Sequence, residues 1–325
     1  MPTTSGTELP VATVARPPSG PPGAGEPRPA AQRRAIGRAI LEWGGATGGS
    51  SRRPELPWRH TRDPWAVLVS EVMAQQTQVS RVVGPYRRFL EQFPSPRACA
   101  TAPLGDVLRA WQGLGYNRRA RSLHGAALAM VERHGGEVPT GLSDLLALPG
   151  VGAYTARAIQ AFAFEADVGV VDTNAGRVLS RAVAGAPLRP ASAQSLVDSL
   201  VPEGAGWAFN QALLDLGALV CLSGTPRCPE CPLQRRCRWA RAGRAGPDPS
   251  RGSAGVSTPQ SAFAGSDRQG RGRLMDALRR GPVGPIDLAP AAGWPDDPDR
   301  AARVADGLVG EGMVARDSDG VLRLP

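Results

Sequence analysis

Apolar residues recur every three to four positions through the middle of this 325-residue chain. Across residues 33–240, which are rich in Ala, Leu and Val, this helical period is clear and the two-residue alternation of strands is nearly absent. The stretch is long enough to bury a sizeable core. We therefore predict an all-α fold for it, beginning with an amphipathic helix near residues 33–43.

Two other stretches carry no periodic pattern. Residues 1–32 are rich in Pro, Gly and Thr, so we predict a disordered N-terminal tail. Residues 241–262 are similarly poor in apolar side chains, and we interpret them as a linker.

In residues 263–325 the apolar positions again follow a periodic pattern. It predicts helices at 271–280 and 298–311, followed by short strands at 313–316 and 321–324. The Asp-Ser-Asp-Gly turn between the strands is typical of a hairpin. We predict a small winged-helix-like module.

The charge balance narrows the possible partners. The chain has 38 basic residues, all of them arginine, against 29 acidic ones, which gives a formal charge of +9. Such an excess favours a polyanion, and nucleic acid over a membrane surface. The sequence has neither an apolar run of membrane-spanning length nor the layout of a signal peptide. We expect a soluble, cytoplasmic protein that associates with the nucleoid.

Four of the five cysteines lie close together with the spacing C-x6-C-x2-C-x5-C. An intracellular protein rarely holds such a group as disulfides, so a metal is the better interpretation. Zinc ribbons normally use two C-x2-C pairs, whereas only one is present here, and four thiolates in one loop also suit an iron–sulfur cluster. The spacing favours a cluster and leaves zinc open. The expected ligands are Cys221, Cys228, Cys231 and Cys237.

Two glycine-containing turns are candidate DNA contacts. Gly150, Val151 and Gly152 separate amphipathic segments, and free backbone amides at the start of the second segment would suit a DNA phosphate. An ordinary helix–helix turn is the alternative. The second turn ends in Gly115-Tyr116 and is followed by several arginines; Tyr116 is either a wedge between bases or a core tyrosine.

The apolar spacing from 65 to 79 predicts one helix with one buried stripe. Glu71, Gln75 and Gln78 form a polar row beside that stripe. Amides at this spacing can bond base edges or fill the gap left by an extruded base, although a solvated helix face is an equal alternative. Beside apolar neighbours, Glu71 is expected to tend toward its protonated form.

Asp172 ends an apolar run and opens the next predicted helix, which is an N-cap position. Most such aspartates are caps and nothing more. Backbone amides and the helix dipole would keep this carboxylate ionised. One neutral acid and one fixed anion form the pair that cleavage of a glycosidic bond requires.

Taken together, these motifs resemble one family. Over residues 33–240 the chain is similar to the helix-hairpin-helix DNA glycosylases of the endonuclease III superfamily, and within it to the MutY-type adenine glycosylases. The segments that carry the resemblance are Leu-Pro-Trp-Arg at 56–59, Ser-Glu-Val-Met at 70–73, Gln-Gln-Thr-Gln-Val at 75–79, Gly-Leu-Gly-Tyr at 113–116, Leu-Pro-Gly-Val-Gly at 148–152, Val-Asp-Thr-Asn at 171–174 and the four cysteines.

The resemblance implies excision of adenine paired with 8-oxoguanine or guanine in double-stranded DNA, and a [4Fe–4S] cluster on the four cysteines. It implies that Glu71 protonates adenine N7 and that Asp172 stabilises the sugar cation. The resemblance also implies that Asn174 helps to position Asp172 and that Tyr154 lies near the reacting sugar. Gln76 and Tyr116 would fill or wedge the duplex, and the neighbouring Gln75, Thr77 and Gln78 would bind DNA. The implied adenine pocket is built from Trp58, Arg59 and Asp215.

Tyr154 separates the chain from endonuclease III-type enzymes, which carry a Schiff-base lysine at the matching position. Because the sequence contains no lysine at all, that chemistry is impossible here. We therefore expect a monofunctional, monomeric enzyme. A glycosylase for oxidised pyrimidines and a non-catalytic iron–sulfur DNA-binding protein are the alternatives.

The chain departs from the family at three places. Thr173 stands where a glycine is common, and Asn117 where a second aromatic is common. Residues 263–325 are too few for the Nudix-like domain that family members often carry; their first residues either contact DNA or form a solvated basic segment. The expected architecture is two helical subdomains, one over 62–165 and one combining 33–43 with 166–240, with Asp172 facing Glu71 between them.

Overall fold

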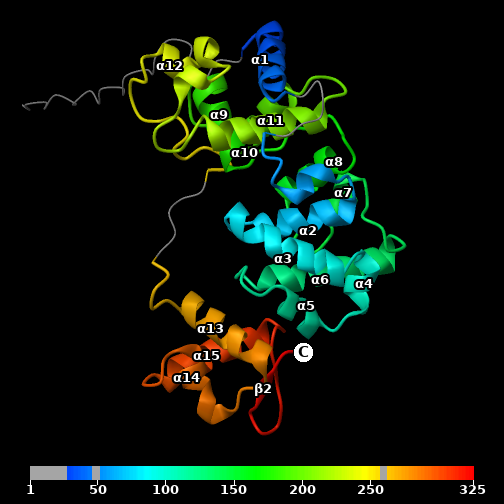
Figure 1. Cartoon of the computed structure of the whole chain (residues 1–325). Coiled ribbons are helices and arrows are strands. Elements are labelled where there is room, and N and C mark those ends of the chain that lie inside the picture. Colours follow the sequence, from blue (N-terminus) through cyan, green and yellow to red (C-terminus); the bar gives the residue numbers. More distant parts are fainter. Residues whose placement is uncertain (1–27, 46–51, 257–261) are drawn as a thin grey trace, which may run out of the picture.

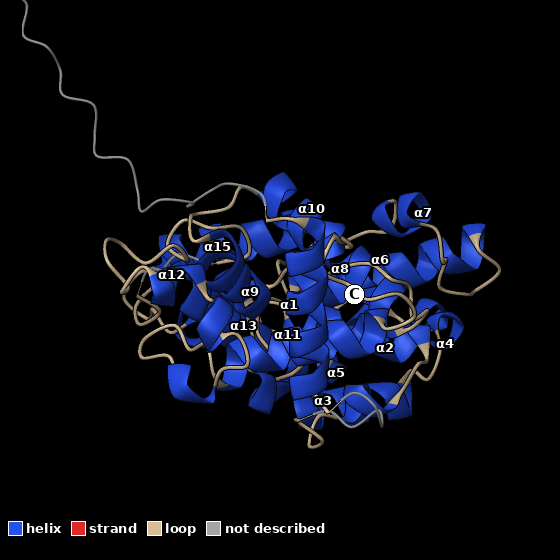
Figure 2. Ribbon diagram, turned by 90° about the horizontal axis from the view of Figure 1, so that it is seen from above, coloured by secondary structure: helices blue, strands red, loops and turns tan. Residues whose placement is uncertain are grey.

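The structure is a computed structural model that describes residues 28–45, 52–256 and 262–325. Helices dominate these residues, and the strands found in them form a single two-stranded hairpin. Figure 2 shows helices throughout the molecule, joined by loops. The predicted all-α class is confirmed. In the described part of the chain, no helix combines the length and apolarity needed to span a membrane.

The elements run in the following order. The α-helices are α1 (Ala30–Trp43), α2 (Pro64–Ala74), α3 (Val79–Gln92), α4 (Pro96–Thr101), α5 (Leu104–Ala110), α6 (Arg118–Arg133), α7 (Leu142–Leu146), α8 (Ala153–Phe162), α9 (Thr173–Val178), α10 (Pro190–Asp198), α11 (Gly206–Leu219), α12 (Arg238–Arg241), α13 (Asp267–Arg280), α14 (Leu288–Ala292) and α15 (Pro298–Gly310). Short 3-10 turns occupy Pro57–His60, Cys228–Glu230, Gln234–Arg236 and Pro285–Asp287, and a π-helical segment continues α9 over Leu179–Ala184. The strands are β1 (Ala315–Arg316) and β2 (Leu322–Arg323).

The helices pack around two separate hydrophobic cores. The first collects buried side chains from α2 to α8, and the second collects those of α1, α9, α11 and the cysteine loop. Figure 1 shows the corresponding groups one above the other, with α13–α15 at the far end. The division agrees with the two predicted helical subdomains.

Helix α2 is shorter than predicted. Asp63 caps its first turn by accepting a hydrogen bond from the Trp65 backbone amide, and nearly every side chain of the helix is buried. It ends at Ala74, not at residue 79, and Gln76 has a left-handed φ of 53°. Glu71 and Gln78 therefore lie on different elements, so the predicted polar row along one helix is wrong.

The first residues that the structure describes fall inside the predicted tail. Helix α1 begins at Ala30, and Arg28 is buried with hydrogen bonds to the carbonyl oxygens of Val183 and Arg236. These bonds use backbone acceptors far along the chain, which a local pattern does not reveal. Residues 1–27 of the predicted tail lie outside the described residues.

The stretch interpreted as a linker also makes contacts. Ser250 and Ser253 are buried, and Asp248 forms an ion pair with Arg181. This segment packs through hydrogen bonds more than through apolar side chains, which explains its featureless hydropathy. Residues 257–261 lie outside the described residues.

The C-terminal segment is a small module of three helices and the hairpin, in which Ala315 pairs with Arg323. Helix α14 was not predicted. Arg279 joins the module to the first subdomain by hydrogen bonds to the Leu108 carbonyl oxygen and to Asn117 Oδ1. Buried apolar side chains of α13 belong to the first core, so the module packs against the first subdomain.

Candidate active site

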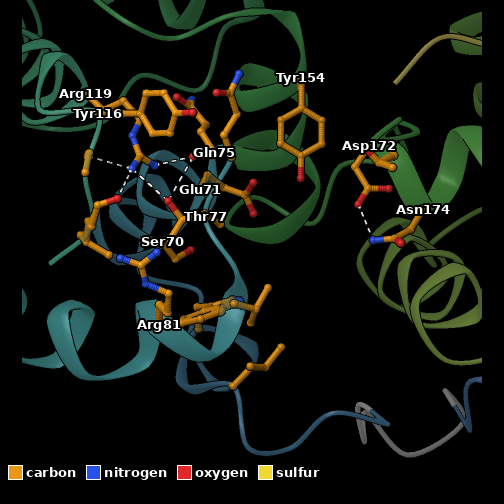
Figure 3. Close-up of a pocket in the computed structure, with 18 of the residues that line it drawn as sticks. Ser70, Glu71, Gln75, Thr77, Arg81, Tyr116, Arg119, Tyr154, Asp172 and Asn174 are labelled. Atoms are coloured by element: carbon orange, nitrogen blue, oxygen red, sulfur yellow. Dashed lines mark hydrogen bonds between the residues drawn. The ribbon is translucent and has the colours of Figure 1, made fainter. Parts of the chain in front are cut away.

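One large cleft runs between the two subdomains and reaches the C-terminal module. Its walls come from α2, α8, α11, the start of α9 and the beginning of α13. Figure 3 shows Tyr154 pointing into the gap between Glu71 and Asp172, which approach from opposite sides. The cleft therefore brings together residues that the sequence separates by about a hundred positions.

Glu71 lies on α2, with its side chain facing the cleft. Burial raises the pKa of its carboxyl to about 7, and the charge of Asp172 acts in the same direction. A hydrogen bond from Tyr154 and the charge of Arg59 oppose the shift. At neutral pH this carboxyl therefore holds a proton for much of the time and can donate it.

Asp172 is the N-cap of α9, as predicted. Its two oxygens accept hydrogen bonds from the Ala175 backbone amide at 2.7 Å and from Asn174 Nδ2 at 2.8 Å (Figure 3). We expected these donors to keep the carboxylate ionised, and they do lower its pKa. Burial is nevertheless the larger influence and raises the pKa of Asp172 above its ordinary value.

Asn174 is itself held in place. Its Oδ1 accepts a hydrogen bond from Arg177 Nη2 at 2.9 Å, which leaves its amide nitrogen for Asp172. Gly217 on α11 packs against Asn174, and a Cβ there would lie 2.6 Å from the Asn174 Cβ. Asn174 thus orients Asp172 from a fixed position.

Tyr154 begins the first turn of α8, two residues after the Gly152 N-cap. Burial and the charges of Glu71 and Asp172 raise its pKa well above the ordinary value. The phenol is therefore neutral, and its hydroxyl is the donor to Glu71.

The three predicted pocket residues lie beside Glu71. Arg59 and Asp215 form an ion pair of 2.9 Å between side chains that are only 7% and 3% exposed. Trp58 contacts Tyr86 edge-to-face, with ring centroids 5.3 Å apart. All three line the cleft, so they form a polar corner with one aromatic wall.

Gln211 completes this corner and was missed from the sequence. It lies one turn before Asp215 on α11, lines the cleft, and is buried with no hydrogen-bond partner for its Oε1. Nη1 of Arg59 is likewise buried without a partner. Unpaired buried polar atoms are costly, so these two are suited to a polar ligand. The signal in the sequence was a group of three polar residues, Asn210, Gln211 and Asp215, in an otherwise apolar helix.

The loop 75–78 crosses one end of the cleft. Arg119 holds it: its guanidinium donates to the carbonyl oxygens of Val72, Met73 and Gln75 and to Thr77 Oγ1 (Figure 3). Desolvation lowers the pKa of Arg119 to about 10. Arg119 is one of the arginines that follow the second candidate DNA-contact turn. In the structure it caps the carbonyl end of α2, where a cation is favoured.

The four predicted residues of this loop differ in solvent exposure and in the hydrogen bonds that they make. Gln75 Nε2 donates to Thr155 Oγ1 at 3.3 Å, and Thr77 is engaged by Arg119. Gln76 and Gln78 are exposed. The loop therefore presents two amides outward and keeps two polar residues for its own support.

The two glycine turns have the backbone that their residues suggested. Gly115 has a φ of 68° and Gly150 a φ of 77°, both in the left-handed region that favours glycine. Gly150 and Gly152 are exposed, whereas Val151 is buried. Tyr116 is 40% exposed and accepts a hydrogen bond from Arg268 at 3.3 Å, so it is not a core tyrosine.

The four cysteines of the loop line one small cavity in the second subdomain. Arg181 Nη1 lies 3.7 Å from Cys221 Sγ, and the Ala240 amide donates to Cys237 Sγ at 3.4 Å. These donors would stabilise thiolate charge. No described group of three or more His, Cys, Asp or Glu side chains meets the spacing of a single bound metal ion. Cys99 is buried in the first core, away from this cavity.

Known proteins match this chain in sequence and in fold. Residues 69–198 match the family described as HhH-GPD superfamily base excision DNA repair protein. The adenine DNA glycosylase of Mycolicibacterium smegmatis is 42% identical over 273 residues, which cover 82% of this chain and 90% of that protein. The human adenine DNA glycosylase is 38% identical over 225 residues, covering 65% of this chain and 40% of that protein.

Solved structures of DNA glycosylases have a similar fold. A thermostable thymine-DNA glycosylase superposes with a TM-score of 0.60 at 29% identity, covering 65% of this chain and 97% of its own. A non-covalent endonuclease III–DNA complex has a TM-score of 0.55 at 24% identity, covering 66% and 99%, and supports the fold alone. The chain therefore belongs to the HhH-GPD superfamily of base excision DNA repair proteins and, within it, to the adenine DNA glycosylases.

Proposed function

We propose that the protein hydrolyses the N-glycosidic bond of adenine paired with 8-oxoguanine or guanine in double-stranded DNA. The observation that carries this proposal is the carboxyl of Glu71. It lies in the cleft opposite Asp172, and its pKa is raised to about 7. A neutral acid facing a hydrogen-bonded carboxylate is the arrangement that glycosidic cleavage requires.

The steps follow from these two groups. Glu71 gives its proton to adenine N7, and the bonding pair of the C1′–N9 bond leaves with the base. Asp172 stabilises the resulting sugar cation, helped by the amides of Asn174 and Ala175 that hold its charge. Water then adds to C1′, and the proton that it loses returns to the Glu71 carboxylate. The chain has no lysine, so no lysine Schiff base with the sugar can form, and we expect the abasic site to stay intact.

The polar corner of the cleft is the proposed adenine pocket. The unpaired Nη1 of Arg59 offers a donor and the unpaired Oε1 of Gln211 an acceptor. Adenine presents ring-nitrogen acceptors and an exocyclic amino donor, so the two atoms complement it. Trp58 supplies a flat apolar wall.

DNA would lie along the outer cleft. We assign phosphate binding to the turn of Gly150, Val151 and Gly152, and filling of the duplex to the exposed amides of Gln76 and Gln78 and to Tyr116, backed by Gly115. Gln75 and Thr77 support that loop. The start of the C-terminal module extends this surface through Phe263 and Arg268. We propose that the protein works as a monomer in the cytoplasm, where its DNA substrate lies.

We assign a [4Fe–4S] cluster to Cys221, Cys228, Cys231 and Cys237. The donor set consists of four thiols around one cavity, with N–H donors directed at two of the sulfurs, and this chemistry fits a cubane cluster. When bound, the cluster would cross-link a loop that otherwise has only two short turns.

A set of labelled duplexes tests the proposal, with adenine opposite 8-oxoguanine, guanine or thymine, and a fourth duplex carrying thymine glycol. We expect strand cleavage only after hot alkali and only for the two mispaired adenines. Alkali-dependent loss of thymine glycol would instead support a pyrimidine glycosylase. Binding without release of any base would support a non-catalytic DNA-binding protein.

A further inference from the structure

Residues 248–255, here called the strap, lie against the start of α9. The Thr173 hydroxyl donates a hydrogen bond of 2.6 Å to the Gly255 carbonyl oxygen. Thr173 is the residue next to Asp172, and both Thr173 and Gly255 line the cleft. A segment that follows the cysteine loop in sequence thus returns to the site of the proposed chemistry.

Two glycines make the contact a close one. Gly255 has a φ of 77°, and a Cβ there would lie 2.5 Å from the Asp172 carbonyl oxygen. A Cβ on Gly176 would overlap with the Ala254 carbonyl oxygen. The backbones of the strap and of α9 therefore touch directly, so a shift of one would move the other.

The other end of the strap is anchored in the second subdomain. Asp248 binds Arg181, with a hydrogen bond of 2.9 Å from Nε, and Arg181 also donates to the carbonyl oxygens of Leu222 and Ser223. Ser253 Oγ accepts from the Leu188 amide at 3.1 Å. These anchors are buried or half-buried, so the strap is a fixed part of this subdomain.

We propose that the strap positions Asp172 for catalysis, with Thr173 and Gly255 as its positioning residues. The inference rests on the proposed function, because it concerns the carboxylate that stabilises the sugar cation. It also accounts for threonine at position 173: the hydroxyl supplies the link to the strap. Small displacements of a reacting group cost large factors in rate, so a loosened strap slows base release without weakening DNA binding.

Thr173→Val removes the hydroxyl and keeps the branched shape. We expect the single-turnover rate of adenine release to fall about tenfold, with the Kd for mispaired DNA unchanged. Thr173→Ser keeps the hydroxyl and should keep most of the rate. Equal rates for wild type and Thr173→Val would overturn the inference, as would an equal loss in both variants.

Gly255→Ala and Gly252→Ala form a matched pair that separates contact from backbone strain. Gly252 has a φ of 75°, but a Cβ there meets nothing within 4 Å. We expect about a 100-fold loss of rate for Gly255→Ala and little change for Gly252→Ala. Equal rates in the two variants would contradict the inference that the strap positions Asp172. If wild-type protein releases no adenine at all, the proposed function fails instead, and the two failures are thereby distinguished.

Discussion

Glu71 and Asp172 influence one another across the cleft, since the charge of Asp172 raises the pKa of Glu71. Amide donors surround Asp172, whereas the hydrogen bond to Glu71 comes from a phenol. The difference in donors favours a proton on Glu71 and a charge on Asp172. The proposed chemistry assigns the acid and the anion in the same way.

Glu71→Gln should abolish adenine release while keeping the fold and the DNA affinity. Glutamine has a similar shape but no proton to give, so we expect a loss of at least about 100-fold in single-turnover rate. Glu91→Gln on the exposed side of α3 is the matched control and should behave as wild type. Normal excision by Glu71→Gln would show that another group is the acid.

The rate of adenine release should fall as the pH rises through about 7. The raised pKa of Glu71 keeps its acidic form present up to that pH, and the form needed for donation is lost above it. Tyr154→Phe removes a hydrogen bond that lowers this pKa. The falling limb should therefore move to higher pH in single-turnover profiles of this variant. A limb that stays in place or moves to lower pH would contradict this account of the Glu71 environment.

Arg119→Met should destabilise the protein by about 3 kcal/mol, because several carbonyl acceptors around the loop 75–78 lose their donor. Urea unfolding followed by circular dichroism measures the change in free energy of unfolding. Arg121→Met changes an exposed arginine on the same helix and should cost little. A similar loss for both variants would mean that Arg119 has no special supporting role.

Local patterns were sufficient for the parts of the site that depend on neighbouring residues. Asp172 caps α9 because the cap is determined by the residues that follow it, and Gly150 adopts the left-handed backbone that its turn requires. The end of α2 was not predictable in this way. The next residues, Gln-Gln-Thr-Gln at 75–78, include neither proline nor glycine to mark the end. The carbonyl oxygens at the end of the helix are bound by Arg119, more than forty residues along the chain.

The strap and Gln211 escaped prediction for a related reason. The strap packs through serines, glycines and one ion pair, so hydropathy cannot distinguish it from a solvated linker. Gln211 becomes a candidate pocket residue only because α11 brings it into the same cleft as Arg59, which comes from a distant part of the sequence. Such contacts arise between segments, and no periodicity within one segment encodes them.

Cys228→Ser should lower the iron and acid-labile sulfide content of the purified protein. A [4Fe–4S] cluster has four of each, and losing one thiolate removes a corner ligand. Cys99→Ser alters a buried cysteine outside the loop and should leave the iron content unchanged. Zinc in place of iron in the wild-type protein would contradict the cluster assignment.

Phe263→Ser should weaken binding to mispaired DNA. Phe263 is 58% exposed and lines the cleft, and the guanidinium of Arg268 lies 5.9 Å from its ring centroid. An exposed aromatic beside a cation suits stacking on a base next to a phosphate, which is worth about 1–3 kcal/mol per base, so we expect Kd to rise roughly tenfold or more.

Ile286→Ser provides the matched control for Phe263→Ser. Ile286 is 89% exposed in the same module but is not among the residues that line the cleft. Fluorescence anisotropy with duplexes carrying adenine opposite 8-oxoguanine, guanine and thymine measures both variants. A loss confined to Phe263→Ser and larger for the mispairs would mean that the module helps to recognise the mispair. Equal binding by both variants and wild type would show that the C-terminal module supports the fold without touching DNA.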